Sequence, residues 1–249
     1  MKILIEGSGR PLVLLHGWGM NSHVWTPIRQ ALLELGQVTY IDLPGHGVNQ
    51  HLTLGSLPQA VAQISPYIPE QATLIGWSLG GLIAQALAQQ LPERVQALSL
   101  IASTPKFVNS ADWAYGLAPE VLQNFANNLQ TDYAATVKRF FALQFLGLKV
   151  DNQQVNQLRE TIMAEPASRQ ALADGLAILA SSDFTQQPVT QPTQWLLGRL
   201  DKLIPVTLAD ALPTLGYTQI DVLANAAHVP FVTQPKLFMQ TLRAFLHAH

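Results

Sequence analysis

A serine flanked by glycines stands at the centre of the segment Gly76-Trp77-Ser78-Leu79-Gly80. This G-x-S-x-G pattern is typical of a nucleophilic serine on a sharp turn between a strand and a helix. The glycines let neighbouring backbone approach closely, and the helix N-terminus favours developing negative charge. Ser78 is therefore the candidate nucleophile for acyl transfer. A glycine-rich structural turn is the alternative, but the apolar run before Ser78 and the helical pattern after it favour the catalytic interpretation.

His228 and Asp201 are the residues that could activate this serine. A serine hydroxyl needs a general base, and the imidazole needs an acidic partner to orient it. Beyond a G-x-S-x-G turn, the acidic residue and then the histidine follow along the chain. Asp201 comes directly after a strand-like run at 194–197, and His228 lies between small residues after the run at 219–223. A turn or helix-capping role is the alternative for Asp201.

Other side chains compete less well for these roles. Asp174 and Asp183 lie in a helical stretch of sequence that resembles a lid rather than the sheet domain. Asp42, His46 and His51 could be imagined as a metal site, but their spacing matches no strong ligand motif. We expect a solvated loop there, and no metal or other cofactor.

The segment His16-Gly17-Trp18-Gly19 follows an early strand-like run and could supply an oxyanion hole. One donor in such sites is the N–H group after the nucleophile, here that of Leu79, and the other comes from a loop after an early strand. The backbone N–H of Trp18 is the best candidate for the second donor. Each such donor contributes on the order of 3 kcal/mol to the transition state. A tight turn in which Trp18 only packs is the alternative.

Short apolar runs alternate with helical patterns and predict the framework for these residues. Strands are predicted at 11–15, 37–41, 72–75, 95–101, 194–197 and 219–223. Helices are predicted at 25–35, 57–68, 79–91 and 235–247, with Pro66 ending the second one early. Alternation of buried strands with helices predicts an α/β fold with a mostly parallel sheet covered by helices on both faces.

Residues 105–190 interrupt this alternation, because helical segments dominate there and no run is convincing as a strand. We expect them to form a helical lid inserted into a core made of residues 1–104 and 191–249.

Composition narrows the class of protein. The chain has 249 residues, of which 48% are hydrophobic and 12% charged, with a formal net charge of -2 and no cysteine. A nucleic-acid binder, a basic membrane-surface protein, disulfides and thiolate chemistry are therefore not expected. The N-terminal segment has no apolar core typical of a signal peptide, and no apolar stretch is long enough to span a bilayer. We expect a cytoplasmic monomer.

Five segments together resemble the α/β-hydrolase superfamily from end to end. They are HGWG at 16–19, DLPGHG at 42–47, GWSLG at 76–80, GRLDKLIP at 198–205 and AAHVPF at 226–231. Within it, the tryptophans of two of these segments and the stretch Arg139–Gln144 are similar to esterases that hydrolyse the methyl ester of pimeloyl-acyl-carrier protein in biotin synthesis. The resemblance implies a serine carboxylesterase that forms an acyl-enzyme and takes acyl-carrier protein as its partner.

The same resemblance implies a set of residues that contact the acyl substrate. They are Trp18, Ser78, Leu79, Phe140, Phe141, Ala142, Leu143, Gln144 and His228. Apolar character alone adds Trp77 to Trp18, Phe140 and Phe141 as side chains that could line a slot for a methylene chain. Core packing is the favoured role for Phe141.

Basic residues near the predicted substrate stretch could steer an acidic carrier protein. Residues 134–150 contain Lys138, Arg139 and Lys149 but no acidic residue, and Arg159 could extend the patch. A solvated helix face is the alternative. For the whole chain, the alternatives are a broad carboxylesterase, a C–C bond hydrolase with the same triad, or a non-catalytic receptor that keeps the fold.

Overall fold

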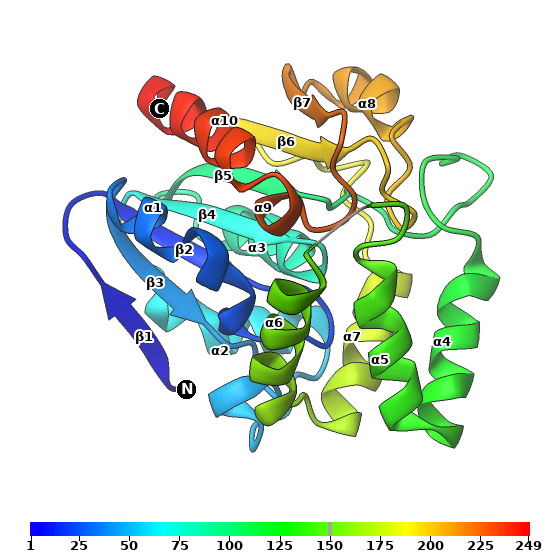
Figure 1. The fold of residues 1–249 in the computed structure, drawn as a ribbon. Coiled ribbons are helices and arrows are strands. Elements are labelled where there is room, and N and C mark those ends of the chain that lie inside the picture. Colours follow the sequence, from blue (N-terminus) through cyan, green and yellow to red (C-terminus); the bar gives the residue numbers. More distant parts are fainter. Residues whose placement is uncertain (149–150) are drawn as a thin grey trace.

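Seven strands form one sheet in the computed structural model, which describes residues 1–148 and 151–249 (Figure 1). The strands are β1 (Ile3–Glu6), β2 (Pro11–Leu15), β3 (Gln37–Ile41), β4 (Ala72–Trp77), β5 (Val95–Ile101), β6 (Thr193–Gly198) and β7 (Gln219–Leu223). Their order across the sheet is β1-β3-β2-β4-β5-β6-β7, and all neighbours from β3 to β7 are parallel. The predicted α/β fold with a mostly parallel sheet is confirmed.

The central strands are buried on both faces, which explains their continuous apolar runs. Every residue of β4 and of β6 is buried, and four of the five residues of β2 are buried. Parallel strands that carry helices on both sides need apolar side chains at successive positions rather than alternate ones. The carboxyl ends of β2, β4 and β6 lie at one edge of the sheet, and the predicted functional loops follow them.

The edge strand β1 was not predicted from the sequence. It is four residues long and pairs antiparallel with β3, with Ile3 opposite Ile41. Leu4 and Ile5 are about half exposed, so the strand buries too little to show an apolar pattern. A short antiparallel strand at the edge of a parallel sheet is a common arrangement.

Helices on the two faces of the sheet belong to separate groups. The first group is η1 (Ser22–Ile28, a 3₁₀ helix), α1 (Arg29–Leu33), α9 (Pro230–Thr233) and α10 (Pro235–Ala248), and the second is α2 (Leu57–Ile64) and α3 (Leu79–Gln90). Figure 1 shows the first group in front of the sheet and the second behind it. Short pieces η2 (Gly47–Asn49), η3 (Ser65–Tyr67), α8 (Leu208–Ala211) and η4 (Leu212–Leu215) complete the connections.

The predicted helix at 25–35 is wrong in its first half. That half is the 3₁₀ helix η1, and the α-helix begins only at Arg29. Pro27 lies inside η1, and its missing N–H prevents a regular α-helix from running through it. The helix α2 ends at Ile64, two residues before Pro66, in agreement with the prediction of an early end.

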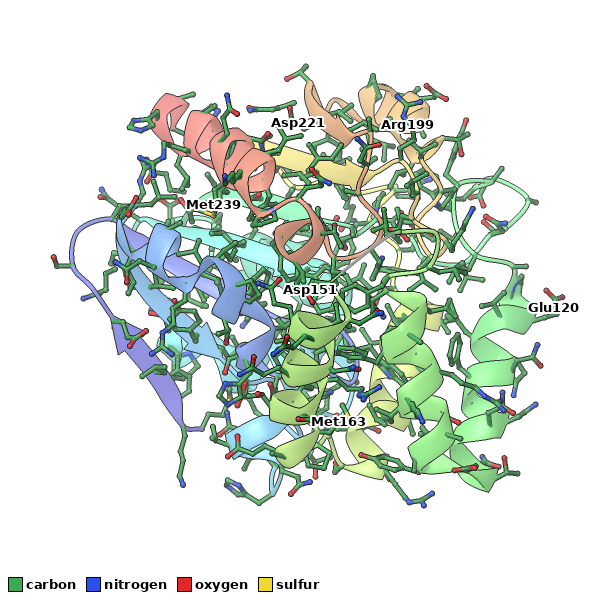
Figure 2. All side chains as sticks on the ribbon, in the orientation of Figure 1. Glu120, Asp151, Met163, Arg199, Asp221 and Met239 are labelled. Atoms are coloured by element: carbon green, nitrogen blue, oxygen red, sulfur yellow. The ribbon has the colours of Figure 1, made fainter. Side chains whose placement is uncertain are left out.

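Four helices lie between β5 and β6 in the chain and gather at the carboxyl edge of the sheet (Figure 1). They are α4 (Pro119–Thr131), α5 (Tyr133–Leu143), α6 (Asn152–Ala164) and α7 (Arg169–Ser181). α7 packs against α4 and also against α3, the helix that follows Ser78. Side chains fill the space among the four ribbons, whereas Glu120 at the start of α4 points outward (Figure 2). None of the helices described is long and apolar enough to cross a membrane.

Candidate active site

Ser78 occupies a strained turn between β4 and α3. Its backbone angles are φ 54° and ψ −118°, a left-handed conformation that residues with a side chain rarely adopt. Holding a residue there costs on the order of 1–3 kcal/mol. The strand ends at Trp77 and the helix begins at Leu79, so the side chain of Ser78 is presented at the carboxyl edge of the sheet.

Three hydrogen bonds hold the backbone of this turn. The N–H of Ser78 donates to the carbonyl of Ile101 in β5 at 2.9 Å. The carbonyl of Ser78 accepts from the N–H of Gly81 at 2.9 Å and from the hydroxyl of Ser103 at 2.8 Å. Ser103 is fully buried, so this bond is shielded from solvent. The strain at Ser78 is therefore held by contacts from the neighbouring strand and the loop after it.

The two glycines of the turn are required by close backbone contacts. A Cβ atom at Gly80 would lie 2.2 Å from the carbonyl oxygen of Leu15, and one at Gly76 would lie 2.6 Å from the carbonyl oxygen of Gly80. Both contacts are with backbone atoms that cannot rotate away. The G-x-S-x-G pattern therefore reflects how closely α3 packs on the ends of β2 and β4.

His228 and Asp201 form a buried pair at the same edge of the sheet. The Nδ1 of His228 lies 2.8 Å from Oδ2 of Asp201, and both side chains are about 1% exposed. The other carboxylate oxygen accepts the N–H groups of Leu203 at 2.7 Å and Ile204 at 3.0 Å. The carboxylate is thereby fixed in orientation, and it can hold the imidazole in the tautomer that carries its proton on Nδ1.

The opposite ring nitrogen of His228 is left as an acceptor. Nε2 is buried and has no hydrogen-bond partner among the described residues. The indole N–H of Trp77, the residue before Ser78, donates to the carbonyl of His228 at 2.8 Å. The loop before His228 packs closely on the end of β6 at Gly198, where a Cβ atom would lie 2.3 Å from the carbonyl oxygen of Ala227. An imidazole held in this way is able to take a proton from a hydroxyl group.

Trp77, which was predicted to line a slot for the substrate, does not line the cavity over Ser78. It is 1% exposed and packs against Trp25, Phe231 and the ring of His228, at centroid distances of 6.5, 5.3 and 5.6 Å. Because its side chain points from β4 into the core, it supports the loop of His228 from below.

A cavity lined by apolar side chains lies over Ser78. Trp18 and Phe140, two of the residues expected to contact the substrate, line this cavity, and their rings meet edge to face at 4.7 Å. Seven further residues line it that the sequence did not single out, namely Phe107, Leu117, Leu122, Phe125, Leu176, Leu179 and Leu203. Four of them, Leu122, Phe125, Leu176 and Leu179, lie on α4 and α7. Helical spacing was the available indication of these four, and it predicts an apolar face without saying what that face covers.

The other residues of the predicted substrate stretch do not line this cavity. Phe141 is buried and packs against Phe145, as favoured from the sequence. The Gln144 amide donates to the Phe140 carbonyl at 3.1 Å within the helix. Ala142 is exposed and Leu143 half-buried, because α5 turns only one face toward the cavity.

The loop at residues 16–19 lies directly against the nucleophile. A Cβ at Gly17 would lie 3.2 Å from the Cβ of Ser78. Among the described residues, no acceptor is found for the backbone N–H of Trp18 or of Leu79. The indole N–H of Trp18 donates to the carbonyl of Leu172 in α7 at 2.8 Å. Two backbone donors near one serine are able to stabilise an oxyanion.

Comparison with known proteins adds an independent observation to this geometry. The family model described as "Alpha/beta hydrolase family" matches residues 12–241. The chain belongs to the alpha/beta hydrolase family. Similar curated relatives are named pimeloyl-[acyl-carrier protein] methyl ester esterase. The esterase of Photobacterium profundum is 38% identical, and the alignment covers 97% of this chain and 96% of the relative. The esterase of Salmonella paratyphi A is 40% identical, and the alignment covers 93% of this chain and 91% of the relative.

Solved structures of other alpha/beta hydrolases share the fold. An esterase from Exiguobacterium antarcticum has a TM-score of 0.89 at 21% identity, covering 98% of this chain and 94% of its own. A bromoperoxidase from Bacillus anthracis has a TM-score of 0.87 at 20% identity, with the same coverage. At this identity the likeness concerns the fold alone.

Two buried histidines lie behind the loop that carries Trp18. The Nε2 of His16 accepts the N–H of Leu43 at 2.9 Å, and the ring of His46 lies 5.1 Å from that of His16. Burial lowers the pKa of His16, and it lowers the pKa of His46 to about 3. Both imidazoles are therefore neutral at pH 7, and they connect the loop at 16–19 to the one at 42–47.

The prediction of a solvated loop around Asp42, His46 and His51 is wrong for two of these three residues. Asp42 and His46 are buried, and only His51 is exposed. Asp42 accepts the N–H groups of Ser22 at 2.6 Å and Val48 at 3.0 Å, so backbone amides satisfy its oxygens. Within the described ranges, no cluster of three His, Cys, Asp or Glu is placed to hold a metal ion.

The competing carboxylates are engaged elsewhere. Asp174 accepts the N–H of Gly55 at 2.8 Å. Asp183 lies 2.8 Å from the ammonium group of Lys106. Burial alone would raise the pKa of Asp183, but the contact with Lys106 and the hydrogen bonds from the hydroxyl and the backbone N–H of Thr185 outweigh it and lower that pKa. Neither carboxylate contacts His228.

The predicted docking residues are spread over two helices. Lys138 and Arg139 are exposed on α5, and Arg159 is half-buried on α6. Lys149 lies outside the described residues.

Proposed function

We propose that this chain hydrolyses the methyl ester of a pimeloyl group carried on acyl-carrier protein, a step of biotin synthesis. Relatives with that name, which are 38–40% identical over more than nine-tenths of the chain, carry the proposal. The strained turn at Ser78 and the buried His228–Asp201 pair supply chemistry that an ester hydrolase needs. No cofactor takes part in the proposed reaction.

In the proposed reaction Ser78 attacks the ester carbonyl while its proton passes to Nε2 of His228. The backbone N–H groups of Trp18 and Leu79 hold the oxyanion, and Asp201 stabilises the charged imidazole. Methanol leaves with the proton from His228, and an acyl-enzyme remains. A water molecule then gives its proton to His228 and attacks the acyl group, which releases the carboxylic acid and restores Ser78.

The helices α4–α7 would then act as a lid, formed by residues 105–190, on the core of residues 1–104 and 191–249. The lid supplies most of the apolar side chains around Ser78, including Phe140 and Leu176. An unbranched methylene chain suits such a lining, since apolar groups there need no hydrogen-bond partners. Cytoplasmic location and a monomeric state stay predictions from the sequence.

Lys138, Arg139 and Arg159 would meet the acidic carrier protein. Complementary charge mainly speeds association, so its loss is expected to lower kcat/KM at low salt. We expect Lys138→Glu combined with Arg139→Glu to lower kcat/KM for the carrier-bound ester and to leave the free methyl ester unaffected. Equal loss on both substrates would point to damage at the site rather than to docking.

Methanol release from pimeloyl-acyl-carrier-protein methyl ester tests the proposal. We expect Ser78→Ala to lower kcat by about 10⁴-fold or more. Ser181→Ala, an exposed serine on α7, is the matched control and is expected to keep full activity. Unchanged turnover in Ser78→Ala would refute the assignment of the nucleophile. The non-catalytic receptor would show no turnover in any form.

A broad carboxylesterase is the second candidate, and the cavity favours it in one respect. The residues that line the cavity offer no charged group that could select a carrier or a carboxylate. The ratio of kcat/KM for the carrier-bound ester to that for free dimethyl pimelate separates the two. A ratio well above one supports the carrier-bound substrate, and a ratio near one supports the broad esterase.

A further inference from the structure

A second apolar hollow lies on the outer side of the lid, between α4 and α7. Small side chains form much of its lining, among them Ala126 of α4 and Ala173 and Ala177 of α7. No charged residue lines it in the described part of the chain. Most of the lining is apolar, and Gln123 and Gln130 are its polar side chains. Such a surface suits an unbranched alkyl chain, which needs width but no hydrogen-bond partner.

Leu122 and Leu176 line both this outer groove and the cavity over Ser78. Leu122 comes from the first turn of α4, and Leu176 comes from the middle of α7. Their exposed fractions are 7% and 6%, so the two side chains face each hollow but little bulk solvent. They are therefore the wall that separates the cavity from the groove.

This wall is rigidly placed with respect to the nucleophile. Gly175, the residue before Leu176, packs closely on Trp18, because a Cβ atom added to it would lie 2.6 Å from Cδ1 of Trp18. The Leu172 carbonyl, one turn earlier, accepts the indole N–H of Trp18 at 2.8 Å. The helix that carries Leu176 is thus fixed on the loop beside Ser78, so the depth of the cavity on this side is set by the size of the side chains.

The closed wall also indicates which end of an ester meets it. A carrier-bound acyl chain stays attached to a protein outside, so it cannot end at a wall of two buried leucines. The free end of the substrate, which is the alcohol group of the ester, can. The basic residues of α5 and α6 agree with this orientation, because no described residue of either helix lines the outer groove.

We propose that Leu122 and Leu176 set the size of the alcohol group that the site accepts, and thereby restrict it to methyl and other short alkyl esters. The inference rests on the proposed esterase function and adds to it two specificity-determining residues. Replacing either leucine with alanine would join the cavity to the groove, and a longer alkyl group would then extend between α4 and α7.

The test is the hydrolysis of methyl, ethyl, butyl and hexyl esters of one short acid, measured as the release of that acid. Butyl exceeds methyl by three methylenes, and each methylene buried in apolar surroundings is worth about a fourfold gain in binding. We expect the butyl-to-methyl ratio of kcat/KM to rise at least about tenfold in Leu122→Ala and in Leu176→Ala. A parallel series with longer acyl groups and a constant methyl alcohol is expected to change far less.

Two leucines of the same helices serve as matched controls. Leu129 lines only the groove, and Leu179 lines only the cavity. Leu129→Ala and Leu179→Ala each lose the same atoms from a buried position but do not remove the wall, so their butyl-to-methyl ratios are expected to stay near that of the wild type. Melting temperatures of all four variants show whether each one folds.

The possible failures are distinct. A wild type that hydrolyses no ester would end the proposed function and this inference with it. A wild type that hydrolyses methyl ester, with unchanged ratios in folded Leu122→Ala and Leu176→Ala, would overturn the inference alone. A ratio that rises equally in Leu179→Ala would show that cavity volume matters and the wall does not. A gain confined to esters with longer acyl groups would show that the wall meets the acyl end of the ester, and it would overturn the inference.

Discussion

Lowering the pH below 6.5 is expected to destabilise the folded protein through His46. Its ring is fully buried, and its Nδ1 lies 3.0 Å from the Pro44 carbonyl, which can only accept a hydrogen bond. Nδ1 therefore carries the proton of the neutral ring. The groups that face it are the ring of His16, whose charge would lower its pKa further, and the carboxylate of Asp42, which raises it in part. Burial dominates these contributions.

The size of the effect follows from the pKa values of the two states. Unfolded histidine has a pKa of about 6.5, and burial lowers that of His46 to about 3. Between these values the unfolded state binds a proton that the folded state excludes, so the free energy of unfolding falls as the pH falls. At about 1.4 kcal/mol per pH unit, the loss reaches about 2 kcal/mol at pH 5. The lowered pKa of His16 adds a loss of the same sign.

Urea unfolding followed by tryptophan fluorescence at pH 7.5 and pH 5 measures this difference. His46→Gln is expected to be less stable at pH 7.5, because packing is lost, but to lose about 2 kcal/mol less than the wild type between the two pH values. His51→Gln is the matched control, since His51 is exposed in the same segment. It is expected to behave as the wild type does.

Parallel losses of stability in the wild type and in His46→Gln would refute the reasoning. They would mean that His46 takes up its proton in the folded state without penalty, so that it is not buried as described. The pH window separates this effect from that of the carboxylates. Hydrogen bonds and nearby cations lower the pKa values of Glu6, Asp112 and Asp183 from the ordinary carboxyl range, so these groups titrate in more acidic solution.

Three further substitutions probe the site itself. Asp201→Asn is expected to lower kcat by about 10⁴-fold with little change in folding, because an amide N–H facing Nδ1 of His228 favours the wrong tautomer; steady-state kinetics and circular dichroism measure both. Gly175→Ala places a methyl group 2.6 Å from Cδ1 of Trp18 and 3.2 Å from Cδ2 of Leu79, so it is expected to move α7 away from the loop that carries Trp18 and to lower kcat at least about tenfold. Activity equal to wild type would show that this contact relaxes without effect. Ser103→Ala removes one of the two donors to the Ser78 carbonyl and is expected to cost about 1–2 kcal/mol in urea unfolding, together with a fall in kcat that reports a displaced turn. Loss of stability with unchanged kcat would make Ser103 a structural residue only.

The interior strands of the fold could be predicted from the sequence because each is a continuous apolar run. The predicted bounds of β2, β3 and β5 agree with the structure to the residue. The edge strand β1 could not be predicted, since two of its four side chains are exposed. The 3₁₀ geometry of η1 was missed although Pro27 was visible in the sequence, because helical spacing of apolar residues does not distinguish the two kinds of helix.

The candidate site also contains residues that the sequence predicts and contacts that it does not. Ser78, Asp201 and His228 follow from local patterns, and these patterns record close backbone approaches such as Gly80 on Leu15. The partners of these residues depend on which distant segments pack together. Nothing in the sequence links Ser103 to the Ser78 carbonyl, and nothing distinguishes Trp77, which supports the loop of His228, from Trp18, which lines the cavity.

The central claim is that Ser78 is a nucleophile activated by the His228–Asp201 pair. Intact-mass measurement after treatment with a fluorophosphonate tests it most directly, since this reagent bonds covalently to activated serines. A single adduct is expected, and peptide mapping should place it on Ser78, with no adduct in folded Ser78→Ala. Equal labelling of Ser78→Ala, or a folded wild type that stays unlabelled, would contradict the claim.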